Sequence, residues 1–305
     1  MTTVDTWPSV TAAIPTKSRP KELAEAVESI LSQDYPGEVR VIIVADRTDD
    51  DPPIPDFDDP RVSVIPNTRS PGLCGARNSG TLASDTDLIA FCDDDDTWLP
   101  GKLRRQVEEL RRVPSSVMCT TAIEVDYDGR RTIRRAGSTL ITHEMLCRTR
   151  MAMLHSSSLV AWRSRLLDEV GLQDETIPGS SVEDWDLQLR VTDKAPFAHV
   201  DEPLVLVNWG ATSAGRVYAR RIADLTWMLD HHPDLRNNRH GAARIYGQLA
   251  FSHAALRHRR EAVTWAFRGM RQRVSDPRWA FTFAVVAGLP ANRIITTLNR
   301  RGRGI

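Results

Sequence analysis

The sequence lacks an apolar run long enough to span a membrane. Its longest apolar stretch, residues 281–289, is far shorter than the roughly 20 residues that a spanning helix needs. Residues 1–10 contain neither a basic segment nor an apolar core, so we expect no secretory signal. The four cysteines include no CxxC pair, which favours a reducing compartment. We therefore expect a cytoplasmic protein that is soluble or, at most, peripheral on the inner face of the membrane.

The sequence also lacks a net charge, since 40 basic residues balance 40 acidic ones. This balance gives no signature of a nucleic-acid binder, and we expect no nucleic-acid partner. The charge is nevertheless uneven, because residues 236–305 contain fourteen arginines and two acids, a net charge of +12. Two interpretations stay open: a cationic face that contacts an anionic membrane or an acidic partner, or a solvated face on packed helices.

Length and apolar content predict one main domain with an extension, because 305 residues with 41% apolar content can bury a substantial core. In the first half, short apolar runs alternate with amphipathic segments, which is typical of βα units that form a largely parallel sheet. The strands are expected at residues 10–14, 39–44, 62–65, 88–92, 157–162 and 204–209. Residues 117–133 favour an antiparallel pair, and beyond about residue 213 the periodicity is helical only. We predict an α/β catalytic domain over residues 1–213 and an Arg-rich helical extension over residues 214–305.

Four consecutive carboxylates follow the apolar strand of residues 88–92. In an extended chain Asp93 and Asp95 face the same side, where two carboxylates repel each other unless a cation lies between them. A hard divalent ion with open positions for phosphate oxygens suits such a pair. The alternative is a solvated acidic turn. The position favours the metal site, because ligands of open α/β sheets bind at the carboxyl ends of strands.

Five segments, in order along the chain, resemble the family-2 glycosyltransferases of GT-A fold. They are Ala13-Ile14-Pro15-Thr16 with Arg19-Pro20, Val44-Ala45-Asp46, the Gly-rich residues 72–80, the Asp-x-Asp element Asp93 to Asp95, and residues 183–190, which begin Glu183-Asp184-Trp185. The resemblance extends from Val10 to about Trp209. It implies a mostly parallel central sheet flanked by helices, a fold that binds nucleotide-diphosphate sugars.

The resemblance also implies roles for individual residues. Asp95 and Asp93 would hold Mn²⁺ or Mg²⁺, and Asp184, with Glu183 beside it, would supply the catalytic base. The donor-binding residues would be Pro15, Thr16, Arg19, Asp46, Arg77, Asp93 and Asp94. The implied reaction transfers a sugar from a nucleotide-diphosphate donor to a hydroxyl of a glycan, lipid-linked or natural-product acceptor, with inversion.

Two departures from the family pattern affect the predicted mode of transfer and the predicted nucleotide. The Gln-x-x-Arg-Trp motif of processive synthases is absent, which favours the transfer of a single sugar. Ala45-Asp46-Arg47-Thr48 stands where many relatives carry Asp-Asp-Gly-Ser, which leaves the nucleotide open.

Structural alternatives accompany several of these residues. Asp184 also suits a helix start, where acids favour the first turn. Arg77 pairs with carboxylates or phosphate, or only supports its helix. We expect His155 to be a satisfied inner histidine, and Trp185 and Trp209 to pack in the core.

Two other functions stay open. A sugar-phosphate nucleotidyltransferase shares the α/β sheet and the metal carboxylates, but it normally has a Gly-rich loop after the first strand, whereas Thr16-Lys17-Ser18-Arg19-Pro20 has no glycine. The second is a non-catalytic protein that binds nucleotide sugars and docks partners through its helical tail.

Overall fold

The computed structural model describes residues 6–17, 19–46, 51–127, 129–179, 181–209 and 214–300. They form two units. The first unit contains Met1–His143, Met151–Glu175 and Glu183–Gly210, and the second contains Glu144–Arg150, Thr176–Val182 and Ala211–Ile305. The two short segments 144–150 and 176–182 therefore belong with the helical unit, although the linear sequence pattern gave no indication of this.

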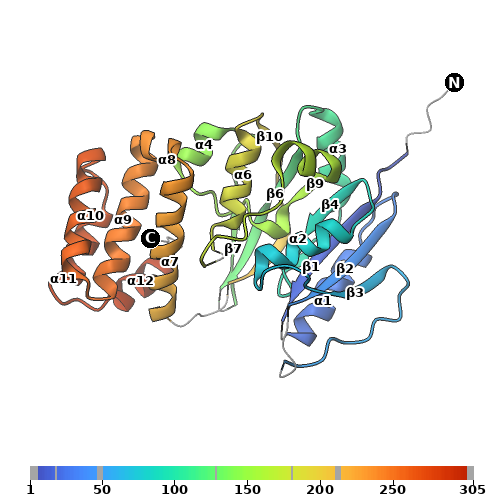
Figure 1. The fold of residues 1–305 in the computed structure, drawn as a ribbon, viewed down its shortest axis with the longest axis horizontal. Coiled ribbons are helices and arrows are strands. Elements are labelled where there is room, and N and C mark those ends of the chain that lie inside the picture. Colours follow the sequence, from blue (N-terminus) through green and yellow to red (C-terminus); the bar gives the residue numbers. More distant parts are fainter. Residues whose placement is uncertain are drawn as a thin grey trace. The chain divides into compact units, whose positions relative to one another are not determined.

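A mixed sheet forms the centre of the first unit, with the strand order β3-β2-β1-β4-β9-β6-β10-β5 (Figure 1). The strands are β1 (Val10–Thr16), β2 (Val39–Ala45), β3 (Val62–Pro66), β4 (Leu88–Phe91), β5 (Thr97–Trp98), β6 (Met118–Tyr127), β7 (Arg130–Arg134), β8 (Leu140–Ile141), β9 (Val160–Trp162) and β10 (Phe197–Asn208). β3, β2, β1 and β4 are parallel to one another, as are β6 and β10. β5, β7, β8 and β9 pair antiparallel. The expected parallel pairing therefore holds for β3, β2, β1 and β4 and for the β6–β10 pair, while the other pairings of this mixed sheet are antiparallel.

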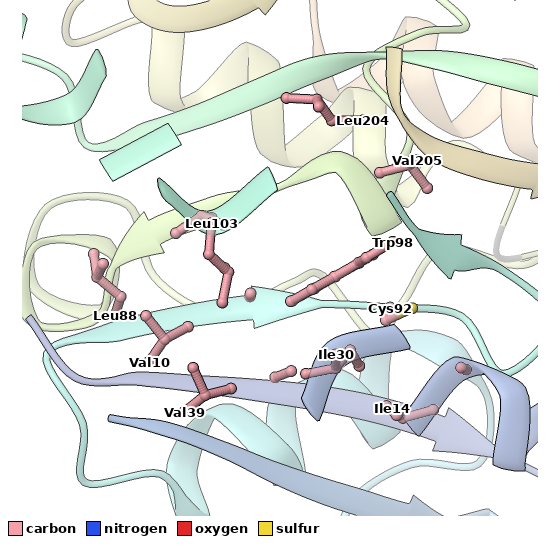
Figure 2. Packing of buried hydrophobic residues seen from close by; sticks show 14 of the residues in the cluster. Val10, Ile14, Ile30, Val39, Leu88, Cys92, Trp98, Leu103, Leu204 and Val205 are labelled. Atoms are coloured by element: carbon pink, nitrogen blue, oxygen red, sulfur yellow. The ribbon is translucent and has the colours of Figure 1, made fainter. Parts of the chain in front are cut away.

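Helices cover the sheet because their apolar residues recur at helical spacing. The first unit contains α1 (Pro20–Leu31), α2 (Leu73–Ala83), α3 (Lys102–Arg112), α5 (Arg163–Arg165) and α6 (Glu183–Thr192), with single turns at Ser156–Ser158 and Leu166–Val170. Leu23, Val27 and Ile30 of α1 are buried in the same cluster as Val10 and Val39. Figure 2 shows Ile30 beside the strands that carry Val10 and Val39. Each such side chain contributes roughly 1.5–3 kcal/mol to folding. The core thus fixes the strands whose carboxyl ends carry the polar residues.

The second unit is helical in its described residues. It contains most of α4 (His143–Arg148), and α7 (Ala214–His231), α8 (Asp234–Asn237), α9 (Arg239–Ala255), α10 (Arg259–Gln272), α11 (Arg278–Val286) and α12 (Ala291–Arg300). α9 packs against α7, α10 and α11 (Figure 1), around a core that includes Ala243, Ala250, Ala266 and Trp279. The expectation of C-terminal helices is confirmed. Within the described residues, no helix combines the length and apolar character that crossing a membrane requires.

Candidate active site

A pocket of about 280 Å³ opens at the carboxyl ends of β1, β2 and β4. These strands are parallel neighbours, so the residues that follow them meet at one edge of the sheet. Of the residues expected at the site, Pro15, Thr16, Arg19, Asp46, Asp93, Asp94 and Asp95 line this pocket. Arg77, Glu183 and Asp184 do not.

The acidic run is a turn rather than an extended strand. The backbone N–H of Asp96 donates to the carbonyl of Asp93 at 3.1 Å, and β4 has already ended at Phe91. Alternation along a strand therefore cannot place Asp93 and Asp95 on one side, and the expectation that it does so was wrong. The turn instead brings Asp93, Asp94, Asp95 and Asp96 into the pocket wall together.

Asp94 is built into the wall by β1 and the residues after it. Its Oδ2 accepts a hydrogen bond from Thr16 Oγ1 at 2.7 Å, and its Oδ1 lies 3.0 Å from Arg19 Nη2. Burial raises the pKa of Asp94 above its usual value, although Thr16 and Arg19 act in the opposite direction. Arg19 also pairs with Asp95, whose side chain is 28% exposed. Asp95 is thus the accessible carboxylate of the two.

Arg77 connects Asp93, which lines the pocket, with Glu183 at the start of α6. It is completely buried, and its Nη2 donates to Asp93 while its Nη1 donates to Glu183 Oε1 at 3.1 Å. Burial alone would raise the pKa of Asp93, but Arg77 and His155 outweigh it, so the pKa lies below the usual value. The sequence left open whether Arg77 pairs with carboxylates or only supports its helix. In the structure its guanidinium pairs with Asp93 and Glu183.

Asp96 and His155 form a second polar group beside Asp93. Asp96 accepts hydrogen bonds from Ser157 Oγ at 2.5 Å and from the Asn208 backbone N–H at 3.2 Å. Burial raises the pKa of Asp96 to about 6, even though His155 opposes this. His155 Nδ1 lies 3.3 Å from Asp96, and its Nε2 lies 3.7 Å from Asp93. Asp93, Asp96 and His155 therefore offer three potential ligand atoms within 4.8 Å of one another.

His155 differs from its sequence expectation, because it lines the pocket with its side chain 24% exposed. Trp209 also lines the pocket and is 39% exposed, so the expectation that it packs in the core was wrong. Trp185 is buried, as expected. The sequence gave no sign of Asn208 or Ser157, which reach Asp96 only through the fold.

Asp46 follows β2 and is fixed by the loop that precedes α2. Asn67 Nδ2 donates to its Oδ1 and the Gly72 backbone N–H to its Oδ2, both at 2.7 Å. Gly75 allows this loop to approach the helix, because an added Cβ would lie 1.9 Å from the Ser70 carbonyl oxygen. Arg47 and Thr48, which distinguish this loop from the family pattern, lie outside the described residues.

Glu175 anchors the same loop from a distant part of the chain. It accepts hydrogen bonds from Ser70 Oγ at 2.6 Å and Asn78 Nδ2 at 2.7 Å, and it also pairs with Arg69. Burial opposes ionisation of this carboxyl, but the hydrogen bonds outweigh burial and lower its pKa to about 2. Asp46 is therefore held in place through a network that the sequence did not indicate.

Glu183 and Asp184 begin α6 and are both buried. Glu183 contacts Arg77, whereas Asp184 Oδ1 accepts a hydrogen bond from the Trp185 backbone N–H at 2.7 Å. This contact suits a helix start. The geometry therefore separates the two acids by their partners.

Solved structures with the same fold include glycosyltransferases. Residues 1–349 of S. aureus TarS in complex with UDP-GlcNAc match with a TM-score of 0.58 and 14% identity, over 97% of this chain and 92% of that chain. The mannosyltransferase PcManGT from Pyrobaculum calidifontis, in complex with GDP-Man and Mn²⁺, matches with a TM-score of 0.55 and 16% identity, over 96% and 84%. These likenesses confirm the expected GT-A fold.

Curated relatives carry related names. The succinoglycan biosynthesis protein ExoO of Rhizobium meliloti (strain 1021) is 33% identical over 129 residues, which are 42% of this chain and 37% of the relative. The E. coli UDP-Glc:alpha-D-GlcNAc-diphosphoundecaprenol beta-1,3-glucosyltransferase WfgD is 26% identical over 110 residues, 36% and 44% of the two chains. Both matches therefore span less than half of the relative. The uncharacterized glycosyltransferase YwdF of Bacillus subtilis (strain 168) is 27% identical over 77% of this chain and 85% of its own length.

The family model of glycosyl transferase family 2 matches residues 11–166. This range contains all but the first residue of β1, the whole of β2 and β4, and the acidic turn, and therefore most of the residues that line the pocket; Val207, Asn208 and Trp209 lie outside it. The chain therefore belongs to glycosyltransferase family 2.

Proposed function

We propose that this chain transfers one sugar from a nucleotide-diphosphate sugar to a hydroxyl group of an acceptor, with inversion at the anomeric carbon. One observation carries the proposal: in a family-2 chain, the pocket at the carboxyl ends of β1, β2 and β4 is lined by four consecutive aspartates. Inversion and single transfer are inferred from the family resemblance and from the absent processive motif.

The pocket suits a hard divalent cation, Mn²⁺ or Mg²⁺. Asp95 and Asp93 would hold it, because their side chains are 28% and 17% exposed and offer carboxylate oxygens. His155 lies within reach of the same position. When bound, the cation would neutralise the charge that develops on the leaving nucleoside diphosphate. Arg19 now pairs with Asp95 on the exposed side, and such a pair contributes only about 0–1 kcal/mol, so a cation would displace it readily.

Asp46 would select the nucleobase. A carboxylate only accepts hydrogen bonds, and each of its oxygens has a second acceptor position beside those used by Asn67 and Gly72. Asp46 could therefore accept a hydrogen bond from a base with a ring N–H on its pairing edge, such as uracil or guanine. Related proteins bind both: the TarS complex contains UDP-GlcNAc, and the PcManGT complex contains GDP-Man.

Asp184 would accept the proton of the attacking hydroxyl. Glu183 is less suited, because its interaction with the buried guanidinium of Arg77 favours the charged, already paired carboxylate. Asp184 is held on the first turn of a helix, which gives a general base the fixed position it needs.

We further propose that the helical unit takes the enzyme to the inner face of an anionic membrane. The proposal rests on the excess of arginine over acidic residues in this unit. The name of WfgD includes a diphosphoundecaprenol-linked acceptor, which gives a precedent for a lipid-linked substrate. An acidic protein partner is the alternative.

Release of nucleoside diphosphate tests the proposed activity. Purified protein with Mn²⁺ is incubated with UDP-glucose, UDP-GlcNAc and GDP-mannose, and the free diphosphate is measured. We expect slow, EDTA-sensitive release from one of the three, with water as the acceptor. Binding without release would indicate a non-catalytic protein. Formation of a nucleotide sugar from a nucleoside triphosphate and a sugar phosphate, with release of pyrophosphate, would indicate a nucleotidyltransferase.

A further inference from the structure

A second pocket, of about 390 Å³, lies within the helical unit. It is formed by the start of α9 and the connection between α10 and α11. Arg239, His240, Arg271 and Arg273 line it, and we call these four residues the cationic pocket. The remaining lining residues, Met270, Gln272 and Val274, are uncharged.

The arginines of the cationic pocket have no acidic partner among the residues that the structure describes. Arg239 donates to the Gln272 carbonyl at 3.2 Å, and Arg273 Nη1 lies 3.1 Å from His240 Nδ1. By contrast, two other arginines of this unit pair with acids: Arg236 with Asp230 at 2.6 Å, and Arg278 with Asp276 at 2.7 Å. Three guanidinium groups around one pocket repel one another, and a bound anion would relieve that repulsion.

The start of α9 adds to this positive potential. Asn238 caps the helix by accepting hydrogen bonds from the His240 and Gly241 backbone N–H groups. Because the helix dipole is positive at this end, it favours an anion beside Arg239. Guanidinium groups bind phosphate oxygens in a bidentate manner, so phosphate is the anion that fits best.

One exposed apolar side chain lines the same pocket, and a second lies one helical turn from a lining arginine. Val274 lines it and is 73% exposed. Phe267, one turn before Arg271 on α10, is 54% exposed. Exposed apolar groups beside uncompensated arginines are typical of surfaces that enter the headgroup region of a membrane. Phe267 also makes an edge-to-face contact with Phe283, which leaves more than half of its side chain exposed, and a freely soluble phosphate would not cover either apolar side chain.

We infer that the cationic pocket binds the phosphate of an anionic phospholipid headgroup, while Val274 and Phe267 enter the lipid interface. This deepens the membrane contact proposed above and is independent of the donor pocket. The occupant is thus lipid rather than a soluble phosphate compound.

Vesicle co-sedimentation tests this inference. Wild type and the double variant Arg271→Gln/Arg273→Gln are compared on phosphatidylcholine vesicles with and without phosphatidylglycerol. Each basic residue near an anionic surface contributes about 1 kcal/mol, so we expect the double variant to bind anionic vesicles roughly 10- to 30-fold more weakly. Val274→Ser should also weaken binding, without changing the charge.

The matched control is Arg259→Gln/Arg293→Gln, which removes the same charge from exposed positions of the unit outside the pocket. We expect it to keep most of the binding. An equal loss in both double variants would overturn the pocket and leave only a diffuse cationic surface. Equal wild-type binding to neutral and anionic vesicles would overturn the inference altogether.

Two further measurements separate the remaining outcomes. If inorganic phosphate raises the melting temperature of wild type but not of Arg271→Gln/Arg273→Gln, and vesicles do not bind, then the ligand is a soluble phosphate and the lipid assignment is wrong. Binding of UDP with Mn²⁺ should be the same in wild type and the double variant. Failure of the glycosyltransferase proposal would instead remove that binding from wild type and leave vesicle binding intact.

Discussion

At the residue scale, the two acids that begin α6 differ in what holds them. Glu183 contacts the buried Arg77, and Arg77 also holds Asp93. Removing one partner of such a buried group costs about 3–5 kcal/mol, because a charge is left unpaired. We therefore propose a structural role for Glu183 and proton transfer for Asp184.

Asp184→Asn should separate these roles. Asparagine keeps the size of the side chain and still accepts the Trp185 hydrogen bond, but it cannot take a proton. We expect turnover to fall roughly 10²- to 10⁴-fold, with the affinity for nucleoside diphosphate and the melting temperature near wild type. Initial rates, diphosphate affinity and melting curves are the measurements.

Glu183→Gln is the matched variant, and we expect it to lower the melting temperature instead. Near-wild-type turnover in Asp184→Asn together with a large loss in Glu183→Gln at unchanged stability would move the base to Glu183.

Lys102, at the start of α3, is a buried cation that the proposed reaction does not use. It is completely buried, and its Nζ has no hydrogen-bond partner in the described part of the chain. The Nζ lies 3.8 Å from the centre of the Trp98 ring, and burial lowers the pKa to about 7. The unfolded chain, with a lysine pKa near 10.5, thus binds a proton between pH 7 and 10.5 that the folded chain does not bind.

The stability of wild type should consequently rise with pH across this window, relative to Lys102→Met. Methionine has a similar length and no charge. The Lys102→Met variant should therefore have a higher free energy of unfolding than wild type at pH 7, and that free energy should not show the increase with pH that Lys102 causes. Urea unfolding of both proteins at several pH values between 7 and 9.5 gives the difference. Parallel pH dependences would show that Lys102 finds a partner or water in solution.

At the element scale, the sequence predicted most accurately the four parallel strands β1 to β4. β1 to β4 were predicted within two residues, because each is a short, mainly apolar run bounded by polar or turn residues; β1, β2 and β4 are largely buried, whereas β3 is partly exposed. The strand expected at residues 157–162 was partly wrong. Ser156–Ser158 forms a helical turn. The Ser157 hydroxyl accepts a hydrogen bond from the Asp93 backbone N–H and donates one to the Asp96 carboxylate, about sixty residues away along the chain.

The residues of the candidate site likewise fall into a group that the sequence predicted and a group that it did not. The aspartates after β4 and Asp46 after β2 were predictable from strand ends alone. His155 and Glu175 were not, because their partners come from other parts of the fold and periodicity carries no such information.

α7 holds the segment that leads into α6. Asp224 is completely buried, and its carboxylate accepts hydrogen bonds from the Gly179 backbone N–H at 2.6 Å and from the Ser181 hydroxyl. A Cβ on Gly179 would lie 2.0 Å from Arg220 Cγ and 2.6 Å from the Asp224 carboxylate, so a larger residue here would force these side chains to move. The chain then continues through Val182 into Glu183 and Asp184. The helical unit therefore positions the segment that precedes the proposed base.

Asp224→Ala should loosen this segment, because the Gly179 N–H would lose its partner at a cost of about 1–3 kcal/mol. We expect faster hydrogen–deuterium exchange over residues 176–192 and lower turnover, with unchanged affinity for UDP and Mn²⁺. Asp230→Ala removes an exposed carboxylate from the same helix and is the matched control. Unchanged exchange in Asp224→Ala would contradict the positioning role.

At the scale of the whole molecule, opposite charges are separated along the chain. Acidic residues gather at the donor pocket, while residues 236–305 carry a net charge of +12. We propose that the first unit performs the chemistry and the second directs the enzyme to its acceptor. If the two units divide the work in this way, nucleotide binding does not depend on the helical unit's membrane contact and can be measured by itself.

Calorimetric titration of EDTA-treated protein with UDP and with GDP, with and without Mn²⁺, tests the central claim most directly. We predict that Mn²⁺ tightens the binding of one nucleotide at least roughly tenfold, or about 1.4 kcal/mol, and that Asp95→Asn removes this gain without lowering the melting temperature. If neither nucleotide gains affinity from Mn²⁺ in wild type, or if Asp95→Asn keeps the whole gain, a cation-dependent donor site at the acidic turn is contradicted.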